Sequence, residues 1–449
     1  MLAAPSIERP DRMDPISWAI VAAFVVLRLV ATVGAGIASY NDTPSYFVFR
    51  LWGAQRFPVV TALYAGLGNE RAIVTVQAFF GAACWAIAGL VLGPLLANLR
   101  VRWGLLAATF ALGLTLPVTS LDTALLSDSI SLSLTVLLTA LLLRLACRPS
   151  SRLTVVVAAT ASVWGFTRQS NAIMAAVLAV AVAVVGARRP HRRLAWPLAG
   201  CLLVVAAVGI SMANANNTIQ QYNVAQVLRH RILDEPAREQ WFLDHGMPGT
   251  AHEIIARDAA TALHPDGTLA LVDDDVFGRW LDTEGSGTYA RFLATHPIFV
   301  LTAPVTDHTV AGGFVAGTTD YGEPRRVLPR FIDALYWPHS KPALVGAALL
   351  AVAVATAVVR RARRTAAVPL GWVPGLALLA VNGANVVLVA HTAGEEYQRL
   401  LLGAATSTRL VVLWLLFAFF DDTSVTALGG SALDDPATPT MHSVHGGRG

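Results

Sequence analysis

A carboxylate follows the first long apolar run of the chain, in the motif Asn41-Asp42-Thr43-Pro44-Ser45-Tyr46. A carboxylate held beside a lipid headgroup can deprotonate an acceptor hydroxyl, so Asp42 is a candidate general base. The alternative is structural, because Thr43 before Pro44 is typical of a helix start and an acid there complements the helix dipole. The position of Asp42 in the sequence leaves both interpretations open.

A second carboxylate, Asp128, lies at the head of another apolar run, in Leu126-Ser127-Asp128-Ser129. Asp122, earlier in the same segment, is placed to cap the start of this helix. At helical rise Asp128 then lies about 9 Å deeper, where an unpaired carboxylate is costly in a membrane. We therefore expect Asp128 to face a cavity or a cation as part of a functional site. A structural ion pair is the alternative.

Several arginines could bind a phosphate group. Arg168 lies at the apex between two short apolar runs, where a guanidinium can hold a phosphate with two hydrogen bonds or can snorkel to the interface. Arg56 in the first external segment could meet a substrate phosphate or an ordinary lipid headgroup. Glu396 and Arg399 flank the last external turn, where a solvated surface ion pair is the simplest interpretation. Arg28, within the first apolar run, must pair with another group or reach a cavity.

The sequence indicates no resident metal or cofactor. The acidic run Asp273 to Asp275 could bind a divalent cation, although a solvated acidic loop is the commoner meaning of such a run. Cys84, Cys147 and Cys201 lack the spacing of a metal site or a disulfide framework. We assign no metal ligand, and a divalent cation remains the only cofactor to consider.

The composition requires that lipid surrounds most of the chain. The chain has 449 residues, of which 55% are hydrophobic and 14% are charged, and its mean hydropathy is +0.56. Such apolar content is too high for a soluble domain of this size. The net charge of +4 comes from short arginine clusters between apolar runs, which indicates membrane topology rather than nucleic-acid binding. Abundant Ala, Val, Leu and Arg, with Lys341 as the only lysine, are typical of a bacterial genome rich in GC.

Apolar runs of about 20 residues can each span a bilayer as a helix. The sequence predicts about ten such helices, near 16–38, 71–97, 103–119, 124–146, 153–167, 169–187, 194–213, 341–360, 367–391 and 400–420. If the N-terminus is cytoplasmic, every arginine cluster between the runs falls on the cytoplasmic side, as the positive-inside rule requires. The same topology makes the C-terminus cytoplasmic and places the candidate site residues outside.

The predicted fold is an all-α polytopic membrane protein with a small extracytoplasmic element. We divide the chain into an N-terminal transmembrane module, an extracytoplasmic loop region, C-terminal transmembrane helices and a disordered cytoplasmic tail. These parts cover residues 1–213, 214–340, 341–420 and 421–449, respectively. The first module includes an external amphipathic loop at 39–70, with an interfacial helix expected from Phe47 to Ala54. Within the loop region, 297–317 is expected to be interfacial or re-entrant.

The order of these motifs resembles the polytopic GT-C glycosyltransferases. This group includes dolichyl-phosphate-mannose-type protein mannosyltransferases and the bacterial lipid A aminoarabinose transferases. The resemblance covers residues 15–215 well and the last 60 residues loosely. The motifs that carry it are Asp42 with Ser45 and Tyr46, Arg56-Phe57-Pro58 to Tyr64, Gln77 and Trp85, Leu126 to Ser129, Thr167-Arg168-Gln169-Ser170-Asn171, and Glu396 with Arg399.

The resemblance implies a role for each candidate residue. It makes Asp42 the catalytic base of the first external loop and Asp128 a second acid that assists or orients. It makes Arg56, Arg168 and Arg399 the groups that hold the polyprenyl phosphate, with Tyr46 and Glu396 in support. Thr43 stands where the commoner pattern has a second acid, which weakens the case for a metal ion in this loop.

The resulting hypothesis is a glycosyltransferase of the bacterial plasma membrane with an extracytoplasmic active site. It would move a sugar from a polyprenyl-phosphate donor to an extracytoplasmic glycan, lipid or protein of the cell envelope, with inversion and with the lipid phosphate as leaving group. Substrate-reading residues are expected within 214–340. The alternatives are a transporter or flippase of a lipid-linked precursor, and a catalytically inactive scaffold with the same fold.

Overall fold

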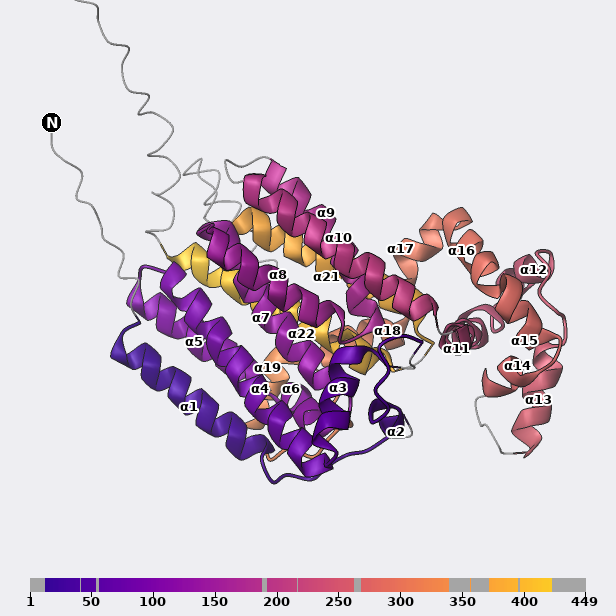
Figure 1. The fold of residues 1–449 in the computed structure, drawn as a ribbon, viewed down its shortest axis with the longest axis horizontal. Helices are drawn as coiled ribbons and strands as arrows, with labels where there is room; N and C mark the ends of the chain where they lie inside the picture. The colour runs from indigo at the N-terminus through magenta and orange to yellow at the C-terminus, as the bar shows by residue number, and fades with distance from the viewer. Residues whose placement is uncertain are drawn as a thin grey trace, which may run out of the picture.

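The structure is a computed structural model in which every regular element is helical. It describes residues 13–40, 42–53, 56–187, 192–215, 217–261, 268–338, 356, 371–394 and 396–421. Within these ranges no strand forms, and the β-type pairing is limited to two isolated bridges, Gly36 with Glu323 and Ala38 with Ala124. Long helices form a bundle, and a group of short helices extends from one end of it (Figure 1).

Among the described residues, seven helices are long and apolar enough to cross a membrane. They are α1 (Pro15–Thr32), α4 (Glu70–Leu92), α7 (Asp128–Cys147), α9 (Gln169–Ala187), α10 (Arg192–Asn214), α21 (Trp372–Thr392) and α22 (Tyr397–Phe420). In this part of the chain, two bent helix pairs raise the number to nine if each pair is one span.

The first bent pair lies in the run 103–119, which was expected to form one span. There, α5 (Leu99–Gly113) and α6 (Leu116–Ser120) meet at 52°, because Pro117 lies at the start of α6, where a proline favours a new helix. The second pair, α17 (Pro297–Thr306) and α18 (His308–Ala316), meets at 54° in the segment expected to be re-entrant. The run expected over 153–167 forms α8 (Ser151–Gly165). The expected run 341–360 and the tail from 422 lie outside the described ranges, apart from residue 356.

Contacts between helix ends define two ends of the bundle. Trp103 Nε1 at the start of α5 donates to Asp14 Oδ1 at the start of α1 (3.0 Å), and Arg148 after α7 donates to the carbonyl of Pro94 after α4 (3.2 Å). Asp421, after α22, accepts from the backbone N–H of Ala97 (2.8 Å) at this same end. We call it the basic end, because six described arginines lie there. They are Arg100, Arg102, Arg144, Arg148, Arg152 and Arg193.

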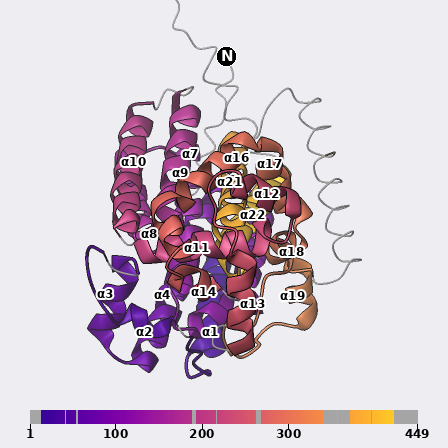
Figure 2. The same ribbon diagram turned by 90° about the vertical axis from the view of Figure 1, so that its right-hand side faces the viewer.

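The opposite end, which we call the site end, holds the starts of α7 and α22 and the turn between α8 and α9. The short helices pack beyond it, and Figure 2 looks onto them. They are α11 (Asn217–Val227), α12 (Pro236–Leu243), α13 (Ala251–Thr261), α14 (Thr268–Asp273), α15 (Phe277–Trp280) and α16 (Ser286–Thr295). This outer unit has a hydrophobic core of its own, with Phe242, Phe277 and Phe292 fully buried.

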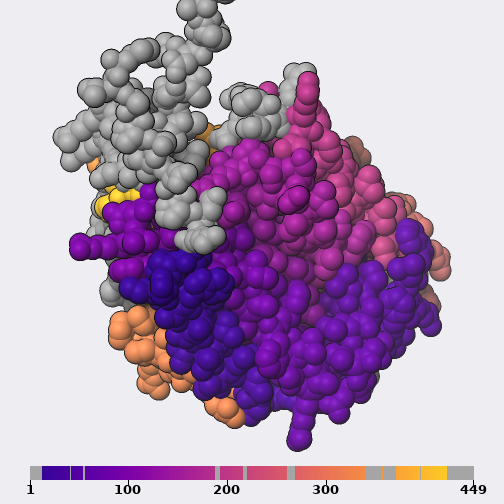
Figure 3. All heavy atoms as spheres, turned by 60° about the vertical axis from the view of Figure 1, so that its left-hand side comes forward, coloured from indigo at the N-terminus to yellow at the C-terminus, as the bar shows by residue number. Residues whose placement is uncertain are grey.

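A connecting segment at 317–329, which we call the strap, crosses the site end between α18 and α19 (Arg330–Tyr336). Arg325 fixes it to the end of α1, donating from its backbone N–H to the carbonyl of Ala31 (2.8 Å) and from Nη2 to that of Gly34 (2.8 Å). In Figure 3 the orange surface of this region lies against indigo α1. Gly322 allows the close approach, since a Cβ there would lie 2.1 Å from the carbonyl oxygen of Ser120.

The interfacial helix expected from Phe47 to Ala54 is wrong for the described residues. The chain forms one helical turn, α2 (Thr43–Tyr46), then an irregular loop, and then α3 (Pro58–Leu67). Gly53 in this loop has φ +64, a left-handed conformation that interrupts a right-handed helix. The loop nevertheless exposes four large apolar side chains. They are Val48, Phe49, Leu51 and Trp52.

Candidate active site

The segment between α1 and α3 is fastened directly to the start of α7. The backbone N–H of Leu125 donates to the carbonyl of Ala38 (2.9 Å), and Thr43 Oγ1 donates to the carbonyl of Leu125 (3.3 Å). Tyr46, 3% exposed, places its hydroxyl 3.3 Å from Ser127 Oγ. These contacts bring Asp42, far away in sequence, to the same place as Asp128.

A buried ion pair supports the same region from inside the bundle. Arg28 Nη2 lies 2.7 Å from Asp122 Oδ2, and the two side chains are 0% and 1% exposed. Ser129 Oγ donates to Asp122 Oδ1 (2.7 Å). The prediction that Asp122 caps the following helix is therefore wrong. The carboxylate pairs with Arg28 because that guanidinium lies within a span and needs a counter-charge.

Asp128 is the first residue of α7, rather than a residue one or two turns inside it. The segment Ala124–Ser127 is held against the first loop instead of continuing a helix from Asp122. The Asp128 side chain is 3% exposed and forms an ion pair with Arg168 Nη1. Asn171 ties the turn that carries Arg168 to α7, donating from Nδ2 to Ser131 Oγ (2.8 Å).

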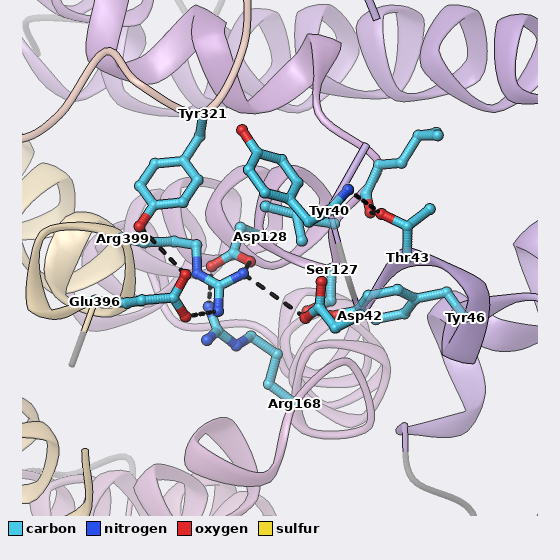
Figure 4. Close-up of polar contacts among 12 residues, drawn as sticks. Tyr40, Asp42, Thr43, Tyr46, Ser127, Asp128, Arg168, Tyr321, Glu396 and Arg399 are labelled. Atoms are coloured by element: carbon cyan, nitrogen blue, oxygen red, sulfur yellow. Dashed lines mark hydrogen bonds and ion pairs between the residues drawn. The ribbon is translucent and has the colours of Figure 1, made fainter. Parts of the chain in front are cut away.

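Arg399 lies at the centre of the site (Figure 4). Its Nη1 is 4.0 Å from Asp42 Oδ2 and 3.9 Å from Asp128 Oδ2, and its Nη2 pairs with Glu396. The side chain is only 10% exposed, and its Nε makes no hydrogen bond in the described structure. The interpretation of Glu396 and Arg399 as a solvated surface pair is therefore wrong for Arg399, which is a buried cation between two carboxylates.

Asp42 does not act as a helix cap. It precedes α2, but its side chain makes no capping hydrogen bond. Its Oδ2 instead lies 2.8 Å from Arg56 Nη2, and Arg56 also donates from Nε to Ser45 Oγ (2.8 Å) and lies over the ring of Tyr46. Asp42 is 25% exposed, so its carboxylate can reach a ligand from outside.

Glu396 has an uncommon backbone conformation. Among the described residues it is the one non-glycine residue with positive φ, at φ 57 and ψ 26. Such a conformation costs free energy and concentrates at functional sites. Burial raises the pKa of Glu396 above its ordinary value, with the nearby Arg399 acting in the opposite direction.

The strap supplies an aromatic group that sequence reasoning missed. Tyr321 donates to Glu396 Oε1 (3.4 Å) and its ring lies 5.6 Å from the Arg399 guanidinium carbon. Its ring also packs against Tyr40 (5.6 Å between centroids). Burial raises the pKa of Tyr321, which keeps its hydroxyl a donor. No local motif marks Tyr321, because only the path of the strap brings it to the site.

The acidic run at 273–275 lies elsewhere, in the outer unit. Asp274 there accepts from the backbone N–H of Phe277 (2.9 Å) and lies 3.7 Å from Arg257, which accounts for it structurally. Within the described ranges, no group of three or more His, Cys, Asp or Glu is arranged to hold a metal ion.

The site therefore alternates three carboxylates with three guanidinium groups at one end of a helix bundle. This arrangement can bind an anion through arginine donors and hold a partly exposed carboxylate beside it. No family model matches the sequence, and no curated protein matches it significantly.

Proposed function

We propose that this chain is a membrane glycosyltransferase of GT-C type, which moves a sugar from a polyprenyl-phosphate donor to an extracytoplasmic acceptor. The observation that carries the proposal is the position of Arg399 between Asp42 and Asp128 at one end of the bundle. An anionic lipid headgroup with its chain in the bilayer presents its phosphate at this depth. A carboxylate beside that phosphate is what activation of an acceptor requires.

The two aspartates suit different roles because they differ in exposure. Asp42 is 25% exposed and has its closest charged partner, Arg56, on one side, so it is suited to take a proton from an acceptor hydroxyl. Asp128 is 3% exposed and paired with Arg168, so it is suited to hold Arg168 and Arg399 in place. Asp42 is thus the proposed base and Asp128 the proposed orienting acid.

Arg399 and Arg168 are the proposed phosphate ligands, with Arg56 beside them. Arg399 retains an unbonded Nε and has its Nη1 at ion-pair rather than hydrogen-bond distance from both aspartates. Nη1 of Arg399 therefore has no hydrogen bond to either aspartate to give up when it binds a phosphate, while Nη2 stays paired with Glu396. Negative charge grows on the phosphate as it leaves, so its stabilisation by these arginines is larger in the transition state than in the bound donor.

The proposed step forms one bond and breaks one bond at the anomeric carbon. The acceptor oxygen attacks this carbon from the face opposite the phosphate, while Asp42 takes the hydroxyl proton. The bond from carbon to phosphate oxygen breaks, and its electron pair remains on the polyprenyl phosphate. Attack from the opposite face inverts the configuration, and no metal ion is required to balance the step.

The distribution of charge supports an extracytoplasmic site. Arginines of the basic end lie at the start of α5 (Arg100), the end of α7 (Arg144) and the start of α8 (Arg152), whereas Asp42 and Arg399 lie at the site end. Cytoplasmic loops are the ones enriched in arginine, so this distribution favours a cytoplasmic basic end. The start of α1 lies at that end, which makes the N-terminal side cytoplasmic as well.

The transporter or flippase alternative has less support from the interior of the bundle. Arg28 is paired with Asp122. Arg409, in the middle of α22, donates to the carbonyls of Val315 and Tyr336 (both 2.7 Å) and lies 3.9 Å from the ring centroid of Trp337. These interior cations hold the helices together, whereas the more accessible charges are at the site end.

The test is sugar transfer by the purified full chain in lipid nanodiscs, with radiolabelled polyprenyl-phosphate sugars as donors and cell-envelope extract as the source of acceptor. Asp42→Asn keeps the size and polarity of the side chain but removes the base. We expect it to lower the transfer rate by about a hundredfold or more.

The matched control is Asp234→Asn, which also removes an aspartate next to an arginine, here Arg229 at 3.3 Å in the outer unit. We expect this variant to transfer sugar at the rate of the unmodified chain. If the unmodified chain is active and Asp42→Asn transfers sugar at the same rate, Asp42 is not the general base. No transfer by the unmodified chain with any donor would refute the enzymatic function.

A further inference from the structure

A polar cavity lies between α7, α9, α21 and α22, next to the ion cluster. Its volume is about 50 Å³, which is room for about three waters or for part of a larger polar group. Asp128, Arg168 and Arg399 form the wall towards the site. The remaining polar side chains in its lining are Ser131, Thr135, Ser170, Asn171, Asn382 and Asn385.

Beyond the ion cluster, the polar groups that line this cavity are amides and hydroxyls. Asn171 and Asn382 are held by Ser131 Oγ (2.8 Å) and Ser407 Oγ (3.1 Å), so their positions are set by the protein. The Oδ1 atom of Asn385 is buried and has no hydrogen-bond partner in the described structure. An unpartnered amide within a membrane-spanning helix is costly, which points to a polar group in the cavity.

We infer that this cavity takes the hydroxyl-bearing edge of an uncharged sugar, with the attached phosphate at Arg168 and Arg399. The inference rests on the proposed function and specifies its donor. Amides and hydroxyls donate to and accept from sugar hydroxyls equally well. The charged groups of the lining, Asp128, Arg168 and Arg399, are paired with one another and the rest of the lining is neutral, so a carboxylate or ammonium substituent on this edge of the sugar would find no unpaired counter-charge.

Gly403 of α22 provides a way to fill the cavity. It belongs to the lining, and a Cβ at this position would make an ordinary contact, 3.9 Å from Thr135 Oγ1. A Cβ at Gly403 therefore fits without displacing the backbone, and the methyl groups of a Gly403→Val variant are expected to take up cavity volume. Gly383 in α21 is the matched control, because it is exposed and a Cβ there meets nothing within 4 Å.

The experiment measures binding of two lipids to the full chain in nanodiscs. The probes are polyprenyl-phosphate-mannose and bare polyprenyl phosphate with the same prenyl chain. We expect the unmodified chain to bind the mannose lipid about tenfold more tightly. Gly403→Val removes this difference and leaves binding of the bare lipid unchanged, while Gly383→Val changes neither affinity. Polyprenyl-phosphate-glucuronate binds no more tightly than the bare lipid.

A second variant covers the case in which Gly403→Val fails to fold. Asn385→Leu keeps the volume of the side chain and removes the amide, so we expect it to weaken binding of the mannose lipid by about three- to tenfold and leave the bare lipid unaffected. Equal affinities of the unmodified chain for the two lipids, or no effect of either variant on binding, would refute the assignment of this cavity to the sugar. Neither result would refute the proposed transferase function. Failure of the unmodified chain to bind either lipid would refute the proposed function itself.

Discussion

Asp42 and Asp128 carry the same charge but differ in burial, so the same substitution has different effects on stability at the two positions. Asp128 is 3% exposed and pairs with Arg168, which is 18% exposed. Asp128→Asn leaves Arg168 and Arg399 without the carboxylate between them. Breaking a buried pair typically costs 3–5 kcal/mol, and the partial exposure of Arg168 places the expected loss at about 3 kcal/mol.

Asp42→Asn, in contrast, breaks a pair in which Asp42 is 25% and Arg56 is 31% exposed. Water can solvate the arginine that remains, so we expect a loss of about 1 kcal/mol or less. The assay is the free energy of unfolding of each purified variant, measured by titration with SDS in mixed micelles.

The double variant Asp128→Asn with Arg168→Gln tests the cause of the larger loss. Removing Arg168 as well removes one of the two arginines that Asp128→Asn leaves unpaired. The stability loss of the double variant is therefore smaller than the sum of the losses of the two single variants. Equal losses for Asp42→Asn and Asp128→Asn, or additive losses in the double variant, would refute the reasoning from burial.

Three further predictions concern the buried pair, the pH dependence and the topology. Arg28→Met or Asp122→Leu alone costs about 3–5 kcal/mol in the same unfolding assay, and the two together recover most of that loss, because neither charge is left alone; additive losses would contradict the pairing. Because burial raises the pKa of Glu396, its carboxylate takes up a proton as pH falls while an ordinary glutamate is still charged. Transfer activity therefore begins to fall, as the pH is lowered, at a higher pH than an ordinary glutamate would give. The pH–rate profile of Glu396→Gln lacks this early fall if Glu396 causes it; a profile identical to that of the unmodified chain would contradict this assignment. In a chain without its native cysteines, Val48→Cys at the site end is labelled by an impermeant reagent on intact cells and Ser151→Cys at the basic end is not; the reverse pattern would invert the topology.

Apolar runs and charge patterns in the sequence were sufficient to place many of the helices. Long runs predict spans such as α4 and α22 because a bilayer requires each span to satisfy its own backbone hydrogen bonds. The runs do not reveal bends, which depend on local packing, and so the run 103–119 alone did not indicate the break between α5 and α6. The predicted total of about ten spans includes the run 341–360, which lies outside the described ranges apart from residue 356, and the described residues hold seven to nine candidate spans.

The residues of the candidate site were identifiable because each is a charged group at the edge of an apolar run. Asp42, Asp128, Arg168 and Arg399 all meet this condition, and the structure brings them together. Their pairings were not identifiable, since they join positions far apart in sequence. Asp122 is the clearest example, because local rules favour a helix cap, but the partner that decides its role is Arg28 in another helix.

Tyr321 shows the remaining limit of sequence reasoning. It reaches Glu396 and Arg399 only because Gly322 and Arg325 hold the strap across the end of the bundle. These contacts depend on the packed surface of several helices, and no periodicity or motif within the strap encodes them. A loop residue of this kind is found only when the tertiary structure is known.

The experiment that tests the proposed function most sharply distinguishes sugar transfer from movement of the donor lipid across the bilayer. The full chain is reconstituted in sealed proteoliposomes with polyprenyl-phosphate-mannose and cell-envelope extract, and two products are measured. These are free polyprenyl phosphate, and intact donor that has crossed the bilayer. If the chain is a transferase, the unmodified chain releases free polyprenyl phosphate and Asp42→Asn releases none above background. Movement of intact donor across the bilayer without any release would contradict this function and identify a flippase.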